Sequence, residues 1–164
     1  MLFFLLILPI YSKLLTDYRY YTTEFDIIIC PNMPIEIYDS VESAVLNTNY
    51  LNYFKMNFYY QTNNLPVFIC ITDTPSQTYF GQFTMGIDIN NKLLLTPNSL
   101  YNVLLHEFGH VMGLDHSNSQ GMMNYTLTAT NINDTLYFVN DQKKLWWSYF
   151  DHYNIYKSFM RVVN

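Results

Sequence analysis

The sequence predicts a single α+β domain in which a small sheet is combined with three helices. Five short runs rich in β-branched and aromatic residues predict strands, because such side chains suit the pleated, half-buried surface of a sheet. Three longer segments carry apolar residues at helical spacing. The chain has 164 residues, of which 50% are hydrophobic and 13% are charged. This length and composition fit one packed domain with its own core.

The N-terminal half of the chain carries one predicted helix and most of the strands. Residues 25–30 form a β-branched run that Pro31 and Pro34 close, which predicts a strand and its end. Residues 37–54 carry apolar side chains near helical spacing, which predicts an amphipathic helix. Further strands are predicted at residues 55–60, 66–71, 79–85 and 87–90. Because the strand at 66–71 does not alternate, we expect it to be buried on both faces.

Two further helices are predicted in the C-terminal half. The first covers residues 97–112. Either Asn98 or Ser99 can cap it, and Gly113 is well placed to end it in a left-handed turn. Residues 117–133 carry no regular pattern. The last predicted helix begins near Asn140 and Asp141 and includes Leu145, Trp146, Tyr149 and Phe150.

The N-terminus begins with an apolar run over residues 1–10. It is too short to span a bilayer, which takes about 20 apolar residues, and it has the length of the apolar part of a secretory signal peptide. We interpret residues 1–12 as a signal peptide and residues 20–164 as one domain. We therefore expect a secreted, extracellular protein without a transmembrane span. An uncleaved anchor and a buried N-terminal strand are the alternatives, because no basic residue precedes the run.

Two cysteines and a net charge of −5 limit the classes of partner. In a secreted chain Cys30 and Cys70 can form one disulfide, but both lie in strand-like apolar runs and could equally be buried thiols. The absence of a C-x-x-C pair argues against a metal site made of cysteines. The acidic charge argues against nucleic acid as the main partner, because such binding needs clustered Lys and Arg. We expect a monomer.

The segment from His106 to His116 carries the chemistry. His106 and His110 are four residues apart, so on a helix both imidazoles project from one face and can reach one ion. Glu107 lies beside that face and can polarise a water at the metal, while Gly113 lets the backbone double back and bring in His116. Three neutral imidazoles and one water make a tetrahedral zinc site with an open position, as catalytic sites have. The alternative, that these are ordinary helix histidines, leaves unexplained why three of the four histidines fall in this motif.

This motif resembles the metzincin signature of zinc proteases. Ser117, directly after the third histidine, resembles the matrixin (matrix-metalloprotease-like) branch. Met122 and Met123 follow six and seven residues later and resemble the Met-turn beneath the metal, with Met123 the better fit to its spacing. The resemblance implies an α+β, zincin-like catalytic domain with a twisted five-stranded mixed sheet, three helices including the zinc-site helix, and a shallow groove between two subdomains.

The resemblance covers residues 20–152 and is densest at the metal motif. Residues 30–34 and 39–44 resemble the first strand and first helix of matrixin catalytic domains, and residues 140–141 resemble the start of their last helix. The sequence departs from the family in two features: we find no upstream cysteine switch to cap the zinc, and the long loop that holds a structural zinc and calcium is shortened. We therefore predict one catalytic zinc ion, leave calcium unassigned, and interpret His152 as a surface or helix residue.

The resemblance implies a zinc-dependent endopeptidase whose zinc-bound water is activated by Glu107 as general base. The substrate would be an extended polypeptide that adds as a strand to the sheet edge at residues 79–85, where Tyr79 and Phe80 would contact it. Asn102 and residues 124–130, which include Tyr125, would wall the pocket just past the scissile bond. Tyr125 would either line that pocket or donate a hydrogen bond to the oxyanion.

Two alternatives stay open. The chain could be a non-catalytic zinc-binding or protein-binding module that kept the fold, although Glu107 is intact and a decayed enzyme would most readily lose it. It could also belong to another metzincin branch, such as an astacin-like one, although Ser117 and the short spacing from histidine to methionine argue against that. Zinc content measured together with the activity of the Glu107→Ala variant separates an enzyme from a binding module.

Overall fold

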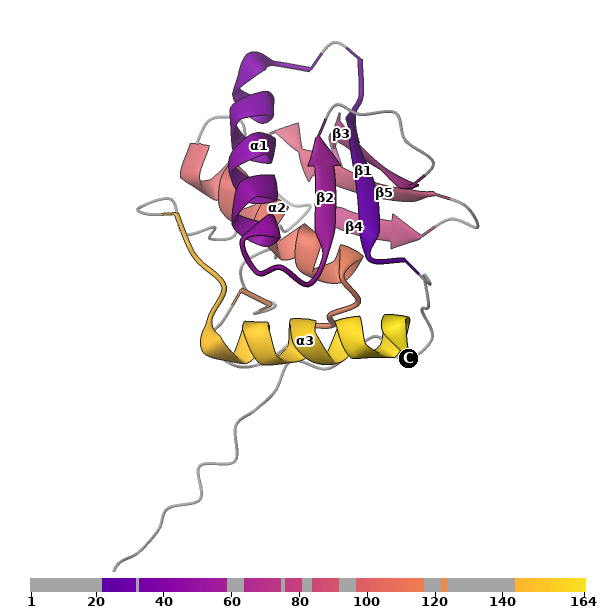
Figure 1. Cartoon of the computed structure of the whole chain (residues 1–164). Coiled ribbons are helices and arrows are strands. Elements are labelled where there is room, and N and C mark those ends of the chain that lie inside the picture. The colour runs from indigo at the N-terminus through magenta and orange to yellow at the C-terminus, as the bar shows by residue number, and fades with distance from the viewer. Residues whose placement is uncertain are drawn as a thin grey trace, which may run out of the picture.

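The chain folds into a five-stranded sheet and three helices (Figure 1). The computed structural model describes residues 22–31, 33–58, 64–74, 76–80, 84–91, 97–116, 122–123 and 144–164. In chain order the elements are β1 (Glu24–Ile29), α1 (Ile35–Asn49), β2 (Lys55–Phe58), β3 (Leu65–Thr72), β4 (Gln77–Phe80), β5 (Met85–Asn90), α2 (Pro97–Val111) and α3 (Tyr149–Val163). The predicted α+β class and the mixed five-stranded sheet are confirmed.

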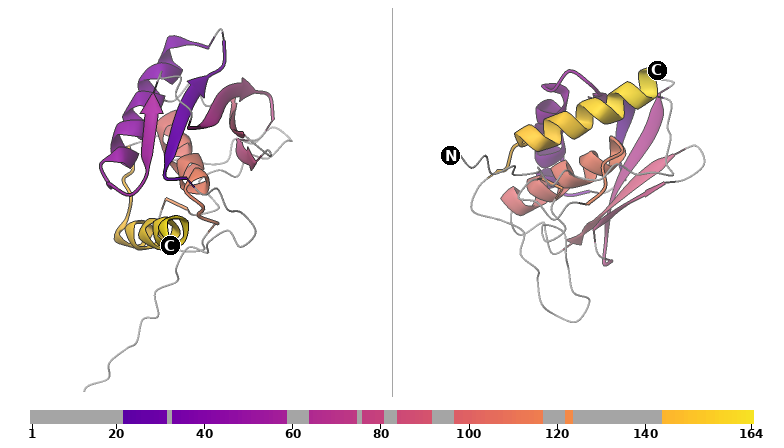
Figure 2. Two further views of the ribbon diagram at one scale, coloured as in Figure 1. Left: turned by 45° about the vertical axis from the view of Figure 1, so that its right-hand side comes forward. Right: turned by 90° about the horizontal axis from the view of Figure 1, so that it is seen from below.

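The strands lie in the order β2-β1-β3-β5-β4. β1 pairs in parallel with β2 and β3, and β3 pairs in parallel with β5. β4 is antiparallel to β5 and forms one edge of the sheet. α1 and α2 pack against each other on one side of the sheet, and α3 crosses its lower end (Figures 1 and 2). The antiparallel edge strand and α2 are the two elements that matter most for the site described below.

The core lies between the sheet and α1 and α2. In β3 and β5 alternate residues are completely buried, as Val67, Ile69, Ile87 and Ile89 show. The prediction that the strand at 66–71 is buried on both faces is wrong, because Phe68 is only partly buried. The reason is that α1 and α2 cover one face of the sheet, so the side chains that alternate with the core residues point to the other face.

Several element boundaries differ from those predicted from the sequence. α1 ends at Asn49 rather than at residue 54, and α2 already begins at Pro97, so Asn98 and Ser99 lie in its first turn and do not cap it. A proline suits the first helical position because its fixed φ is already helical. The predicted strand at 79–85 is divided, since β4 ends at Phe80 and Met85 opens β5.

The last helix shows the largest shift. α3 begins at Tyr149 with Ser148 as its N-cap, so Leu145 and Trp146 precede the helix instead of belonging to it. Ser148 and Asp151 form a capping box, in which each side chain accepts a hydrogen bond from the other residue's backbone N–H. The start predicted at residues 140–141 lies outside the described residues. This box fixes the helix start more firmly than the apolar spacing that guided the prediction.

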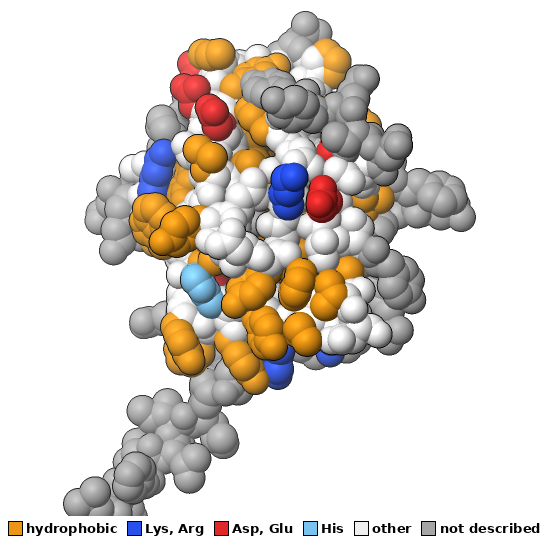
Figure 3. Space-filling model, viewed as in Figure 1, with side chains coloured by type: hydrophobic (Ala, Val, Ile, Leu, Met, Phe, Trp, Pro, Cys, Tyr) orange, Lys and Arg blue, Asp and Glu red, His pale blue; other side chains and the backbone are white. Residues whose placement is uncertain are grey.

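α3 is amphipathic and leaves aromatic side chains exposed. It buries Asp151, Asn154, Ile155 and Ser158 against the rest of the domain. Its exposed aromatic residues are Tyr149, Phe150, Tyr153 and Tyr156, and apolar side chains gather over this helix in the space-filling view (Figure 3). No helix among the described residues is long and apolar enough to span a membrane.

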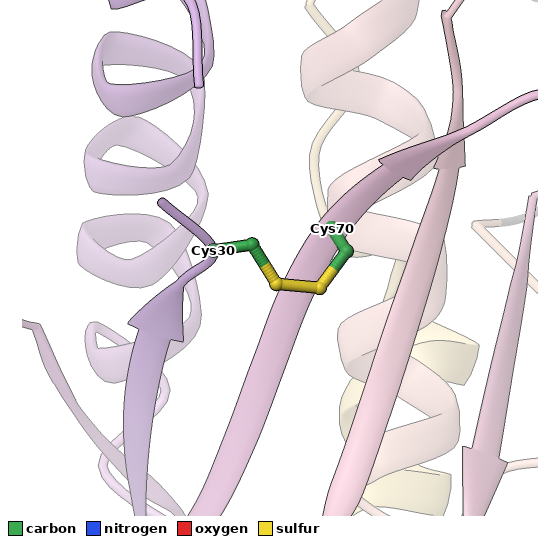
Figure 4. The surroundings of a disulfide bond; sticks show 2 residues. All are labelled: Cys30 and Cys70. Carbon is green, nitrogen blue, oxygen red and sulfur yellow. A yellow bond between two sulfur atoms is a disulfide. The ribbon is translucent and has the colours of Figure 1, made fainter. Parts of the chain in front are cut away.

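Cys30 and Cys70 form a disulfide (Figure 4). The sequence left a disulfide and two free thiols as alternatives, and the structure has the disulfide. Cys30 directly follows β1 and Cys70 lies in β3, so the bond joins two neighbouring parallel strands. It closes a chain segment with a sequence separation of 40 that contains α1 and β2.

Candidate metal centre

α2 carries two of the candidate metal ligands and the candidate base within a helix that is mostly buried. Its apolar residues Leu100, Leu104 and Phe108 are completely buried. His106 and Glu107 lie among them, and both are almost entirely inaccessible to solvent. The core packing of α2 therefore holds these two polar side chains in place.

A left-handed turn after α2 brings in the third histidine. Gly113 has a φ of +86°, a backbone conformation that residues other than glycine rarely adopt. Its N–H donates to the carbonyl of His110, and the N–H of Leu114 donates to the carbonyl of Gly109, each at 2.9 Å. These two bonds make a Schellman motif, which ends the helix and reverses the chain. His116 then returns to the face of α2 that carries His106 and His110.

The three imidazoles converge. The Nε2 atom of His116 lies 3.1 Å from that of His106 and 3.2 Å from that of His110. Ligand nitrogens of a tetrahedral zinc ion, each about 2.0–2.1 Å from the metal, are about 3.3 Å apart. The three side chains therefore fit a single zinc ion and form the group of potential metal ligands found among the described residues.

Backbone carbonyls orient two of the rings. Nδ1 of His106 lies 2.7 Å from the carbonyl oxygen of Met122, and Nδ1 of His110 lies 2.7 Å from that of Leu114. A carbonyl can only accept, so each Nδ1 carries the proton and each Nε2 keeps its lone pair for a metal. The Schellman motif contributes here as well, because it positions the Leu114 carbonyl.

Burial keeps the imidazoles neutral. It lowers the pKa of His106 to about 3 and that of His110 to about 4, from an ordinary value of 6.5. Burial also lowers the pKa of His116, although the neighbouring Asp115 opposes the change. Neutral imidazole is the form that binds zinc, so the site is ready for a metal at neutral pH.

Glu107 is held by the edge strand of the sheet. Oγ1 of Thr78 in β4 lies 2.5 Å from Oε2 of Glu107 and donates a hydrogen bond to it. Burial raises the pKa of Glu107 to about 7 from an ordinary value of 4.5, and the negative charge of Asp88 adds to the rise. The hydrogen bonds from Thr78 act in the opposite direction. Sequence analysis missed Thr78, because its partner is 29 residues away and no local motif contains it.

The two methionines pack next to the histidine-bearing part of α2. Met122 and Met123 are buried, and the sulfur of Met123 lies against Gly109, between the two ligand positions on α2. The carbonyl of Met122 accepts from His106, as described above. Its N–H donates to Oδ2 of Asp151 in α3 at 3.2 Å. Sequence analysis missed Asp151, although Ser148 and Asp151 have the spacing of a capping box.

The predicted substrate-binding residues have mixed outcomes. Tyr79 and Phe80 lie in edge strand β4 with 45% and 36% of their surface exposed. The ring of Tyr79 covers Gly86, its partner in β5, so a Cβ on that glycine would come within 1.9 Å of the ring. Asn102, which was predicted to wall the pocket past the scissile bond, is completely buried, and its Oδ1 accepts from the N–H of Leu145 at 2.7 Å.

Some predicted site residues cannot be placed. Tyr125, Ser117 and the pocket wall at 124–130 lie outside the described residues. His152 lies exposed on α3, as expected for a surface or helix residue. The described part of the site therefore consists of three imidazoles, one buried carboxylate, and the turns and strand that orient them.

Comparisons with known proteins agree with this geometry. The family model Peptidase_M10, described as Matrixin, matches residues 47–149, which is more than half of the chain. Among solved structures, high choriolytic enzyme 1, a hatching enzyme zinc-protease from the medaka fish Oryzias latipes, is 12% identical with a TM-score of 0.56. The match covers 92% of this chain and 94% of that one.

A structure of myroilysin is 17% identical with a TM-score of 0.44, covering 63% of this chain and 54% of that one. No curated protein matches the sequence. At 12% identity, the likeness to the hatching enzyme concerns the fold alone.

Proposed function

Because the chain belongs to the matrixin family of zinc metalloproteases, we propose that it hydrolyses peptide bonds of extended polypeptides with one zinc ion and a glutamate base. In this proposal His106, His110 and His116 hold the ion, and Glu107 is the general base. The observation that carries the proposal is that Nε2 of His116 lies 3.1 Å from that of His106 and 3.2 Å from that of His110. His106 and His110 lie on α2, the helix that also carries Glu107.

The environment of Glu107 supports its proposed role as general base. When bound, zinc would acidify a water molecule and polarise the scissile carbonyl. Glu107 takes a proton from the attacking water and later delivers it to the leaving amine. A carboxylate that both accepts and returns a proton works best with a pKa near the working pH. The pKa of about 7 that burial gives Glu107 supports this role.

The substrate in this proposal adds as a strand to the free edge of β4. The described residues provide β4 with a neighbour on one side only, which is β5. A peptide paired with the other edge gains main-chain hydrogen bonds, whatever its side chains are. The ring of Tyr79 is already packed over Gly86, so we assign substrate contact to the backbone of β4 and to the accessible side chain of Phe80.

We also propose that the protein is secreted, with residues 1–12 as its signal peptide. The disulfide between Cys30 and Cys70 supports this proposal, because such bonds persist in oxidising compartments outside the cytosol. Edman sequencing of the protein secreted by an expressing cell tests it directly. A secreted product that starts after residue 12 is the expected result, and a product that stays inside the cell or keeps Met1 contradicts the proposal.

The activity is tested with the purified protein and a quenched peptide substrate. We expect one equivalent of zinc, cleavage that phenanthroline stops, and recovery when zinc is added back. The Glu107→Ala variant should keep the zinc and lose turnover. Glu42→Ala, which removes an exposed carboxylate on α1, is the matched control and should cleave as the wild type does. Zinc bound to both wild type and Glu107→Ala, with no cleavage by either, would identify a binding module instead.

A further inference from the structure

We propose that Thr78 is a positioning residue that couples the seating of a peptide on β4 to the orientation of Glu107. The inference rests on the proposed function, since it concerns the same base and the same substrate edge. It adds a residue that the metal motif does not contain.

Thr78 lies on the side of the sheet that faces α2. It pairs with Ile87, whose side chain is completely buried on that side. Directly paired residues of neighbouring strands project to the same face, so Thr78 points towards α2 while Tyr79 projects to the opposite face. The contacts of Thr78 agree with this direction, because its Oγ1 lies 2.5 Å from Oε2 and 3.3 Å from the backbone oxygen of Glu107.

The hydroxyl of Thr78 has one proton, and the carboxylate is the nearer of the two acceptors. Hydrogen bonds from a hydroxyl to a carboxylate are short and strong because the acceptor is charged. Among the described residues, no other side chain donates a hydrogen bond to Glu107. A β-branched side chain also has restricted rotation about χ1, so the backbone position of Thr78 closely determines where its hydroxyl lies relative to the carboxylate.

That backbone belongs to an edge strand of the sheet. β4 has four residues, and within the described part of the chain only β5 pairs with it. A peptide that adds to its free edge completes the hydrogen bonding of the strand on both sides. A bound substrate therefore restrains β4 and, with it, the hydroxyl of Thr78. The restrained hydroxyl then holds Glu107 in the orientation that proton transfer needs.

The test compares Thr78→Val, Thr78→Ser and the wild type on two peptides. The long peptide has enough residues before the scissile bond to pair with β4, and the short one does not. Thr78→Val keeps the branched shape without the hydroxyl, and should lower kcat on the long peptide on the order of 10- to 100-fold, with KM and zinc content unchanged. Thr78→Ser restores a donor and should recover most of the loss.

The coupling between peptide binding on β4 and the orientation of Glu107 is measured by the ratio of kcat for the long and the short peptide. In the wild type, kcat should be higher for the long peptide than for the short one, because only the long one pairs with β4 and restrains its movement. In Thr78→Val that ratio should fall towards one. A residue that merely stabilised the fold would lower both rates in proportion and leave the ratio unchanged. Thr72→Val in β3 makes the same chemical change away from the site and should alter neither kcat nor the ratio.

The outcomes separate the two proposals. An inactive wild type overturns the proposed function itself. An active wild type whose Thr78→Val variant is folded, loaded with zinc and equally fast overturns the role of Thr78 and leaves the function intact. A loss of zinc, or a loss of rate that serine does not restore, also overturns the positioning role. If valine prevents folding, Thr78→Ala, which places no methyl group against the carboxylate, decides by the same readouts.

Discussion

Asp151 on α3 accepts a hydrogen bond from the backbone N–H of Met122, with 3.2 Å between Oδ2 and the nitrogen. The carbonyl of the same methionine lies 2.7 Å from Nδ1 of His106. One residue therefore connects the C-terminal helix to a candidate metal ligand. Oδ2 of Asp151 also accepts from the N–H and the hydroxyl of Ser148, so the start of α3 and the support of the metal site share one carboxylate.

Replacing this carboxylate should weaken metal binding without touching a ligand. Asp151→Ala leaves the N–H of Met122 without its acceptor and releases the turn that orients His106. Outer partners of metal-binding histidines typically contribute 10- to 100-fold in affinity, so we expect a loss of about that size. Competition with a chromogenic zinc chelator measures it.

Ser148→Ala is the matched control for that variant. It removes the N-cap of α3 and should lower the free energy of unfolding by about 1 kcal/mol, but it leaves the bond from Met122 to Asp151 in place. Zinc affinity should stay at the wild-type level. Equal loss of affinity in both variants would mean that the helix start, and not the link to Met122, supports the ligand.

Gly109→Ala should destabilise the protein although alanine is the better helix former. The exchange gains about 0.8–1 kcal/mol in intrinsic helix propensity. The new Cβ, however, would lie 2.2 Å from the sulfur of Met123, which is buried and cannot move aside freely. Such overpacking costs about 1–3 kcal/mol, so we expect a net loss in urea unfolding and weaker zinc binding.

The double variant of Gly109→Ala with Met123→Ala provides the control. Removing the methionine side chain removes the clash, so the two changes together should cost less than the sum of their separate effects. Additive losses would show that the glycine is needed for a reason other than the methionine that packs against it.

The convergence of the three candidate ligands and the fold class were predictable from the sequence, for a local reason. His106, Glu107 and His110 share one helical turn, and Gly113 is the residue that a left-handed turn requires, so spacing alone indicates their arrangement. The order of strands and helices followed from short patterns in the same way.

The supporting residues were not predictable, because they depend on pairing between distant parts of the chain. Thr78 reaches Glu107 only because β4 pairs with β5 and β5 packs against α2. Asn102 is helically spaced from His106, but this spacing does not indicate the hydrogen bond that its Oδ1 accepts from the N–H of Leu145, shortly before α3. Whether Cys30 and Cys70 are bonded depended on the register of β1 and β3, which composition does not encode.

The metal-free protein should show opposite pH dependences from its histidines and from Glu107. The folded-state pKa values of His106 and His110 are depressed to about 3 and 4, so their contribution to stability is present above pH 6.5 and is lost as the pH falls through the folded values. The pKa of Glu107 is raised from 4.5 to about 7, so its contribution is present below pH 4.5 and is lost as the pH rises through 7.

The Glu107→Gln variant isolates the contribution of Glu107 to the pH dependence of stability. In the metal-free state, the free energy of unfolding of the variant relative to wild type should increase between pH 4.5 and 8, by roughly 2–3 kcal/mol. Urea unfolding in the presence of a chelator, at several pH values, measures the difference. Parallel curves for the two proteins would show that the carboxyl titrates alike in the folded and unfolded chain.

Loss of the disulfide should lower stability without changing the metal site. The Cys30→Ser and Cys70→Ser double variant opens a segment with a sequence separation of 40, for which restriction of the unfolded chain contributes about 2–4 kcal/mol. The bond joins β1 and β3, whereas the ligands lie on α2 and the turn after it, so zinc content should stay the same. An unfolding midpoint that reducing agent does not change would contradict this expectation.

The Schellman motif after α2 also has a consequence for the order of folding. It brings the first and third imidazoles together across only ten residues of chain. Closing so short a loop costs little conformational entropy, whereas in the chain with its disulfide reduced the parallel pairing of β1 with β3 has to close a much longer loop. We therefore expect the ion to be captured early in refolding, by a nearly local hairpin of helix and turn on which the sheet is assembled afterwards.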